Sequence, residues 1–264
     1  MSEEPVMIIF EHGILSGGFA WEWVVSRLPD RAVPIVHDRQ GTSTFDIAFR
    51  RTDYHAVKSR LDHLLPLELK RSARVVLVGH SIGGLLVRAH AHALGARLAG
   101  IVYVDPSPPE QFEPATDTDY QFLRLQQLLL KHAARSTVNK TPNASDVEVI
   151  NLLPSRVREG AIHRLTDHRF WLNAYREARS AGNRWLDAAI FPEFDNCPTV
   201  VVSSSVSARP DSLQNQFEER LLSAANPSMR ILAREASHET VVYDERESTA
   251  VNRGIDWVLK EVEA

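Results

Sequence analysis

Short apolar runs alternate with longer segments of helical spacing along the first hundred residues of the chain. The apolar runs are rich in β-favouring residues and are predicted as strands over 6–10, 32–37, 73–78 and 100–104. Apolar residues at helical spacing separate these runs over 19–28, 55–69 and 82–98. Because a crossover between parallel strands needs about a dozen residues or more, the alternation predicts a parallel sheet covered by helices on both faces.

The alternation stops at Pro106-Ser107-Pro108-Pro109, and the sequence from there to about residue 195 contains no convincing strand. Helical spacing with large aromatic side chains predicts helices over 120–135, 157–165 and 171–185. The strand pattern resumes over 198–203 and 228–232, with helices predicted over 213–224 and 247–262. We therefore expect an α/β fold with a mainly parallel sheet of about six strands. Its core would comprise residues 1–105 and 196–264, and residues 106–195 would form an inserted helical cap.

Composition and net charge indicate which classes of molecule the protein can bind. The 264 residues are 44% hydrophobic and 24% charged, close to the averages of globular proteins, and the length fits one domain with an insertion. The net charge of −4 provides no basic field, which argues against nucleic acid or a membrane surface as a partner. A small-molecule substrate is the partner that we expect, and the oligomeric state stays open.

The sequence contains no pattern typical of a disulfide, a metal site, a nucleotide cofactor or a signal peptide. The one cysteine, Cys197, cannot form an internal disulfide, and no Cys/His cluster has the spacing of a zinc site. The glycine-rich stretches match neither a Rossmann nor a P-loop fingerprint, so we expect neither a metal nor an organic cofactor. The acidic first residues and the short apolar run over 6–10 are not typical of a signal peptide or a membrane span. We expect a cytoplasmic protein.

A serine motif follows the strongest predicted strand. Gly79-His80-Ser81-Ile82-Gly83 matches G-x-S-x-G, the nucleophile elbow, in which a serine occupies a tight turn between a strand and a helix. Glycine is favoured beside the serine because this turn is too crowded for larger side chains. The motif follows the strand over 73–78 and opens the helix over 82–98, which is the context that it requires. We therefore predict that Ser81 is a nucleophile.

With this motif the chain resembles the α/β-hydrolase superfamily over nearly its whole length. The matching segments are 6–13, 38–43, 77–84, 100–109 and 236–239. The resemblance implies that the serine attacks an acyl carbon, that a histidine after the last strand accepts its proton, and that a carboxylate orients this histidine. It implies a serine hydrolase that cleaves a carboxylic ester, lactone or thioester through an acyl-enzyme. Acyl transfer, cyclisation, lyase chemistry and a ligand-binding role without hydrolysis stay open as alternatives.

His238 has the position that the superfamily gives to the base, a few residues after the last predicted strand. The acid is less clear from the sequence, because Ser204 and Ser205 follow the strand over 198–203, where relatives usually carry Asp or Glu. Asp105 ends the preceding strand, a position from which some relatives supply the acid, and is the residue that we favour. Asp211 is the alternative, although its sequence context is typical of a helix N-terminus.

Two main-chain amides are candidates for an oxyanion hole, whose donors stabilise the charge that develops in acyl transfer. Ile82 N–H follows the nucleophile directly, and Ile14 N–H follows His12-Gly13, which is similar to the oxyanion loop of the superfamily. Aromatic residues near the site and in the expected cap are either core residues or part of a substrate pocket. The substrate-binding candidates are Trp21, Phe122, Trp171 and Tyr175.

Overall fold

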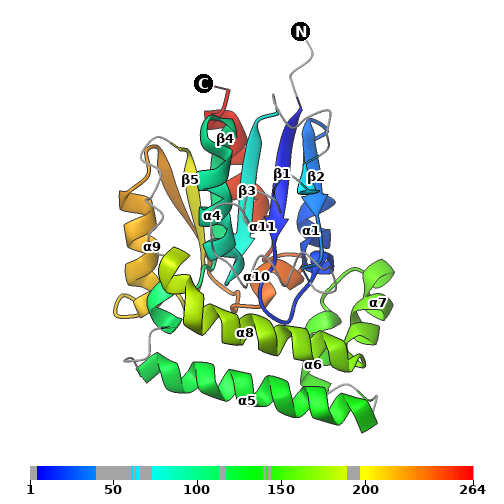
Figure 1. Ribbon diagram of the computed structural model, residues 1–264. Helices are drawn as coiled ribbons and strands as arrows, with labels where there is room; N and C mark the ends of the chain where they lie inside the picture. Colours follow the sequence, from blue (N-terminus) through cyan, green and yellow to red (C-terminus); the bar gives the residue numbers. More distant parts are fainter. Residues whose placement is uncertain are drawn as a thin grey trace.

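Six parallel strands form one sheet in the part of the chain that the structure describes (Figure 1). This computed structural model describes residues 5–39, 61, 63–65, 73–112, 117–138, 141, 144–188 and 197–263. The strands are β1 (Val6–Glu11), β2 (Ala32–Val36), β3 (Val75–His80), β4 (Leu98–Val104), β5 (Thr199–Ser204) and β6 (Ser228–Ala233). Their order is β2-β1-β3-β4-β5-β6, and every neighbouring pair is parallel. The predicted fold class and strand number are therefore confirmed.

Burial along the strands follows their place in the sheet. Every residue of β1, β3 and β5 is buried, as expected for strands that are covered on both faces. The outermost strands β2 and β6 are partly exposed. Pro34 lies in β2, where an edge position tolerates a residue that cannot donate a ladder hydrogen bond.

Alternate residues of the strands pack against two separate layers of helices. On one face, Met7 and Ile9 of β1 belong to a core cluster with residues of α4 (Gly83–Leu94) and α9 (Leu213–Ser223). On the other face, Ile8 and Phe10 belong to a cluster with residues of α1 (Glu22–Val25) and α11 (Thr249–Glu261). The period of two along each strand thus produces the three-layer architecture visible in Figure 1.

Two of the predicted helices are not observed as continuous helices in the described residues. The segment over 19–28 forms a 3-10 turn, Gly18–Trp21, followed by the single turn of α1, rather than one continuous helix. The helix predicted over 55–69 lies largely outside the described residues.

A helical region, residues 117–188, lies across the carboxyl ends of the strands (Figure 1). It contains α5 (Asp117–Val138), α6 (Ala144–Ile150), α7 (Ser155–Leu165) and α8 (His168–Ala188). The long helices α5 and α8 pack on each other, and α8 also contacts α4 of the core. We call this region the cap region. Among the described helices, none has the length and apolarity needed to cross a membrane.

Candidate active site

The turn after β3 has the geometry of a nucleophile elbow. Ser81 adopts a left-handed conformation with φ of +56°, which is strained for a residue with a side chain. A Cβ atom at Gly79 would lie 2.5 Å from Val87 Cγ2, and one at Gly83 would collide with the main-chain carbonyl of Glu11. The two glycines of the motif are therefore required by the close approach of β3, α4 and the end of β1.

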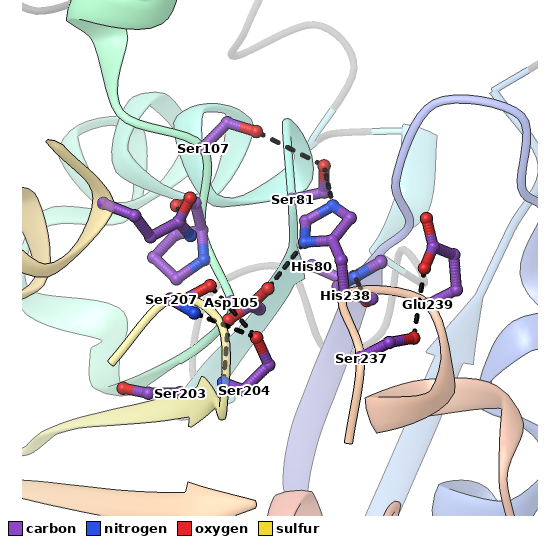
Figure 2. Close-up of polar contacts among 12 residues, drawn as sticks. His80, Ser81, Asp105, Ser107, Ser203, Ser204, Ser207, Ser237, His238 and Glu239 are labelled. Carbon is purple, nitrogen blue, oxygen red and sulfur yellow. Dashed lines mark hydrogen bonds and ion pairs between the residues drawn. The ribbon is translucent and has the colours of Figure 1, made fainter. Parts of the chain in front are cut away.

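A continuous line of hydrogen bonds joins Ser81, His238 and Asp105 (Figure 2). His238 Nε2 lies 2.9 Å from Ser81 Oγ, and His238 Nδ1 lies 2.6 Å from Asp105 Oδ2. The three residues come from the ends of β3 and β4 and from the loop after β6. Parallel strands end at the same edge of the sheet, so their C-terminal loops bring these distant residues together.

Asp105 is fully buried behind the histidine and has main-chain support. The Ser204 N–H donates a 2.8 Å hydrogen bond to Asp105 Oδ1. Burial alone would raise the pKa of Asp105, but hydrogen bonds from His238, Ser207 and Ser204 together with the charge of His238 lower this pKa to about 2. The carboxylate is therefore ionised at neutral pH.

Asp211, the alternative acid, lies elsewhere. It is exposed and precedes α9, whose N-cap is Ser212, with Ser212 Oγ accepting a 2.9 Å hydrogen bond from Asn215 N–H. The structure thus brings Asp105, and not Asp211, into contact with His238. Ser204, the last residue of β5, contributes in another way, because its main-chain N–H donates a hydrogen bond to Asp105.

The electrostatic surroundings prepare His238 to accept a proton. Burial opposes a charge on the ring, but the hydrogen bond and charge of Asp105, with a contribution from Glu239, raise the pKa of His238 above its ordinary value of 6.5. Because Nδ1 faces a carboxylate, we assign the ring proton to Nδ1. Nε2 is then free to accept the proton of Ser81.

Sequence reasoning missed two neighbours of this line. His80 Nε2 lies 2.7 Å from the main-chain oxygen of His238, and the two rings are 4.8 Å apart. Burial and the charge of His238 lower the pKa of His80 to about 3, so its neutral ring donates this hydrogen bond and anchors the His238 loop. Ser107 Oγ lies 3.3 Å from Ser81 Oγ. No pattern around Ser107 in the sequence distinguishes it from a loop serine.

The two proposed oxyanion donors flank the nucleophile. Ile82 is the N-cap of α4, where main-chain amides lack partners within the helix and the helix dipole favours negative charge. Ile14 lies in the loop after β1, and a Cβ added at the adjacent Gly13 would be 3.2 Å from Ser81 Cβ. Within the described residues, neither amide donates to a main-chain acceptor.

A cavity of about 870 Å³ opens onto Ser81, within the size range of small-molecule sites. Its wall combines apolar residues of the β1 loop and the cap region with polar residues at the end of β5 and in the segments that follow β4 and β5. The apolar part includes Ile14, Leu15, Phe19, Leu125, Val149, Ile150, Leu165, Phe170 and Trp171. The polar part includes Ser107, Gln111, Ser204, Ser207 and Gln214.

The aromatic candidates have different positions. Trp171 lines the cavity, as expected. Trp21 does not, because it is fully buried in the core, with its ring 5.1 Å from that of Phe10. Tyr175 is also absent from the described wall and packs against the hydrophobic core instead. The side chain of Phe122 lies outside the described part of the structure.

Across the described ranges, no group of three or more His, Cys, Asp or Glu residues is placed to hold a metal ion.

The sequence and structure of the chain were compared with those of known proteins. No curated protein matches the chain. Among solved structures, a bromoperoxidase from Bacillus anthracis is 19% identical with a TM-score of 0.64, and the match covers 97% of this chain and 92% of that protein. An esterase from Exiguobacterium antarcticum is 15% identical with a TM-score of 0.65, covering 99% and 93%. MenH from S. aureus is 16% identical with a TM-score of 0.62, covering 99% and 96%.

These structures share the fold of the chain at low identity. The sequence also matches the alpha/beta hydrolase family over residues 8–253, from the middle of β1 into α11. A match of this extent includes the elbow, the Asp105 loop and the His238 loop. The chain therefore belongs to the alpha/beta hydrolase family.

Proposed function

We propose that the protein is a serine hydrolase that cleaves an uncharged carboxylic ester, lactone or thioester through an acyl-enzyme. The observation that carries the proposal is the line of hydrogen bonds from Ser81 Oγ through His238 to Asp105, which borders a cavity large enough for a small organic substrate. A buried carboxylate, an imidazole and a hydroxyl in this order form the arrangement that activates a serine for acyl transfer.

In the proposed mechanism His238 Nε2 accepts the proton of Ser81 as Oγ attacks the carbonyl carbon. Asp105 stabilises the imidazolium that forms and keeps the ring in the tautomer with a proton on Nδ1. His238 then returns the proton to the leaving group. Water, deprotonated by the same imidazole, attacks the acyl-enzyme and releases the acid and Ser81.

The charge that develops on the carbonyl oxygen needs donors that are already in place. The Ile82 and Ile14 amides are proposed for this role because they flank Ser81 and have no main-chain partner in the described structure. Preorganised donors of this kind contribute about 3 to 4 kcal/mol each to transition-state stabilisation.

The charge of the cavity wall favours an uncharged substrate. Apart from the two histidines, the charged side chains among its described residues are Asp105 and Glu239, both acidic. Much of the remaining wall is aliphatic or aromatic. An anionic substrate would lose its hydration there and gain no lysine or arginine partner from the described wall.

The decisive experiment is labelling and turnover with matched serine variants. Wild-type protein is expected to hydrolyse a short nitrophenyl ester and to react with a fluorophosphonate at Ser81. Ser81→Ala should lose both activities, whereas Ser107→Ala, which removes the neighbouring hydroxyl, should keep the label at Ser81. Turnover by Ser81→Ala, or a label on Ser107, would overturn the proposal. Product analysis with added alcohol separates hydrolysis from acyl transfer.

A further inference from the structure

A cluster of buried charges lies next to the loop that carries Ile14, apart from the line of Ser81 and His238. Arg39 follows β2, Glu11 ends β1 and Glu177 belongs to α8, and the side chains of all three are fully buried. Burial of a charge is costly unless the charge is paired and hydrogen-bonded. Each of these three buried side chains therefore needs charged or hydrogen-bonding partners, and those partners show which part of the chain the cluster holds in place.

The Arg39 guanidinium binds the β1 loop through two consecutive main-chain carbonyls. Nη1 donates to His12 O at 2.5 Å, and Nη2 donates to Gly13 O at 3.2 Å. On its other sides, Nη1 lies 3.2 Å from Glu11 Oε2, and Nε donates to Glu177 Oε1 at 2.9 Å. The planar fork of an arginine can meet all four oxygens at once, which the single ammonium of a lysine cannot.

His12 completes the support of the same peptide. Its Nδ1 lies 2.8 Å from Gly13 O, and its Nε2 lies 3.3 Å from the Arg39 N–H. Burial and the charge of Arg39 hold the pKa of His12 well below its ordinary value. The neutral ring therefore carries its proton on Nδ1 and donates to Gly13 O, while Nε2 accepts from Arg39.

The Gly13 carbonyl and the Ile14 N–H belong to one peptide group. This group is planar and trans, so its C=O and N–H point in opposite directions, and fixing one fixes the other. A cationic donor on the carbonyl also polarises the peptide and strengthens its N–H as a donor. Arg39 and His12 thus control both the direction and the strength of the Ile14 amide.

We propose that Arg39 is a positioning residue for oxyanion stabilisation, which aims and polarises the Ile14 N–H through the Gly13 carbonyl, and that Glu177 of α8 holds Arg39 in place. The inference rests on the proposed function and adds a dependence of the oxyanion hole on the cap region. Packing of α8 against the core brings Glu177 to the guanidinium. The set of contacts that orients the Ile14 N–H is therefore complete only when this helix is packed.

The test uses two variants that keep the buried site compatible with folding. Arg39→Lys retains the positive charge between Glu11 and Glu177 but cannot bind both carbonyls. Glu177→Gln keeps an oxygen that can accept from Arg39 Nε and removes the charge that holds the guanidinium. The control is Arg164→Gln, which breaks another pair between the cap region and the core, Arg164 Nη2 to Asp38 Oδ2 at 2.6 Å, without touching the Gly13 carbonyl.

The probe is an alkyl trifluoromethyl ketone. Ser81 Oγ adds to its carbonyl carbon, the serine proton moves to His238 Nε2, and the carbonyl π electrons become an oxyanion, so its affinity reports the oxyanion donors. The methyl ketone of the same chain measures binding of the ground state. Fluorophosphonate titration measures the fraction of competent sites, and thermal unfolding by circular dichroism verifies the fold.

We expect kcat and trifluoromethyl ketone affinity to fall together, by about 100-fold in Arg39→Lys, the loss typical of one oxyanion donor, and by about 10-fold in Glu177→Gln. KM and methyl ketone affinity should change by less than about threefold, and the pH midpoint set by His238 by less than about 0.5 pH units. In Arg164→Gln, every quantity should stay within about threefold of wild type and the pH midpoint within about 0.5 units. A role in folding alone would instead lower the fraction of titratable sites and leave kcat per site unchanged.

Folded variants with wild-type kcat per site and wild-type trifluoromethyl ketone affinity would overturn the inference. If Arg39→Lys does not fold, Glu177→Gln decides by the same two measurements. Failure of the proposed function looks different, because wild-type protein itself would then show neither turnover dependent on Ser81 nor fluorophosphonate labelling.

Discussion

Asp105→Asn is the substitution for which the structure gives the sharpest expectation. Asp105 Oδ1 accepts from the Ser204 N–H at 2.8 Å, and Oδ2 faces His238 Nδ1 at 2.6 Å. In the asparagine variant the amide oxygen must stay toward Ser204, because two N–H groups cannot face each other. The amide NH₂ is then directed at His238 Nδ1.

This orientation inverts the role of the imidazole. An NH₂ donor at Nδ1 selects the tautomer with the proton on Nε2, and Nε2 can then no longer accept the proton of Ser81. The same change in a Ser-His-Asp arrangement lowers kcat by about 10⁴. That factor corresponds to about 5.5 kcal/mol in the activation free energy. Because the substitution keeps the shape of the side chain, the fold should persist.

Initial rates of nitrophenyl ester hydrolysis, divided by the fluorophosphonate-titratable sites, measure this loss. Asp211→Asn is the matched control, since Asp211 is exposed beside α9 and makes no contact with His238 in the described structure; its kcat should stay within about twofold of wild type. A kcat for Asp105→Asn within tenfold of wild type, or a large loss in Asp211→Asn, would refute the assignment of the acid.

Three further predictions concern pH and charge. Because Asp105, against the effect of burial, raises the pKa of His238, the acid limb of kcat/KM should have its midpoint above 6.5, and a pH–rate profile with a midpoint below 6.5 would contradict this. Nitrophenyl butyrate should be hydrolysed with a kcat/KM about tenfold or more above that of mono-nitrophenyl succinate at pH 8, and Glu239→Gln should narrow the gap; equal rates would count against an acidic cavity wall. Burial raises the pKa of Glu218 from 4.5 to about 7, so the folded state binds the proton more tightly; this stabilisation is complete below pH 4.5 and is lost as the pH rises through 7. Glu218→Gln should remove a pH dependence on the order of 3 kcal/mol from the free energy of unfolding in this window, measured by urea denaturation, and an unchanged pH dependence would refute the role of Glu218.

Much of the architecture could be predicted from the sequence because its signals are local. Strand runs such as 6–10 and 73–78 are apolar because the central strands are covered on both faces, and that pattern is visible in a few consecutive residues. The elbow is local as well, since Gly79 and Gly83 are required by a turn of five residues. The position of Ser81 is therefore predictable. The order of strands and helices along the chain is predictable too, because strands and helices have different hydrophobic periods.

The partners of Ser81 depend on contacts between distant parts of the chain. His238 lies 133 residues from Asp105 in the sequence, and the Ser204 N–H that supports Asp105 is 99 residues away from it. Sequence reasoning favoured Asp105 but left Asp211 open, because pairing of β4 with β5 decides which carboxylate faces the histidine. The same limit explains Trp21, whose apolar ring fits a core and a pocket equally well until its neighbours are known.

The parallel α/β sheet and the serine at its carboxyl edge could be predicted from local patterns, because hydrophobic period and glycine spacing act over a few residues. The position of Arg39 between the β1 loop and Glu177 of α8, by contrast, follows from the packing of distant segments. No periodicity encodes that pairing, since it depends on how the cap region packs on the core and on the requirement that buried charges find partners wherever the fold places them.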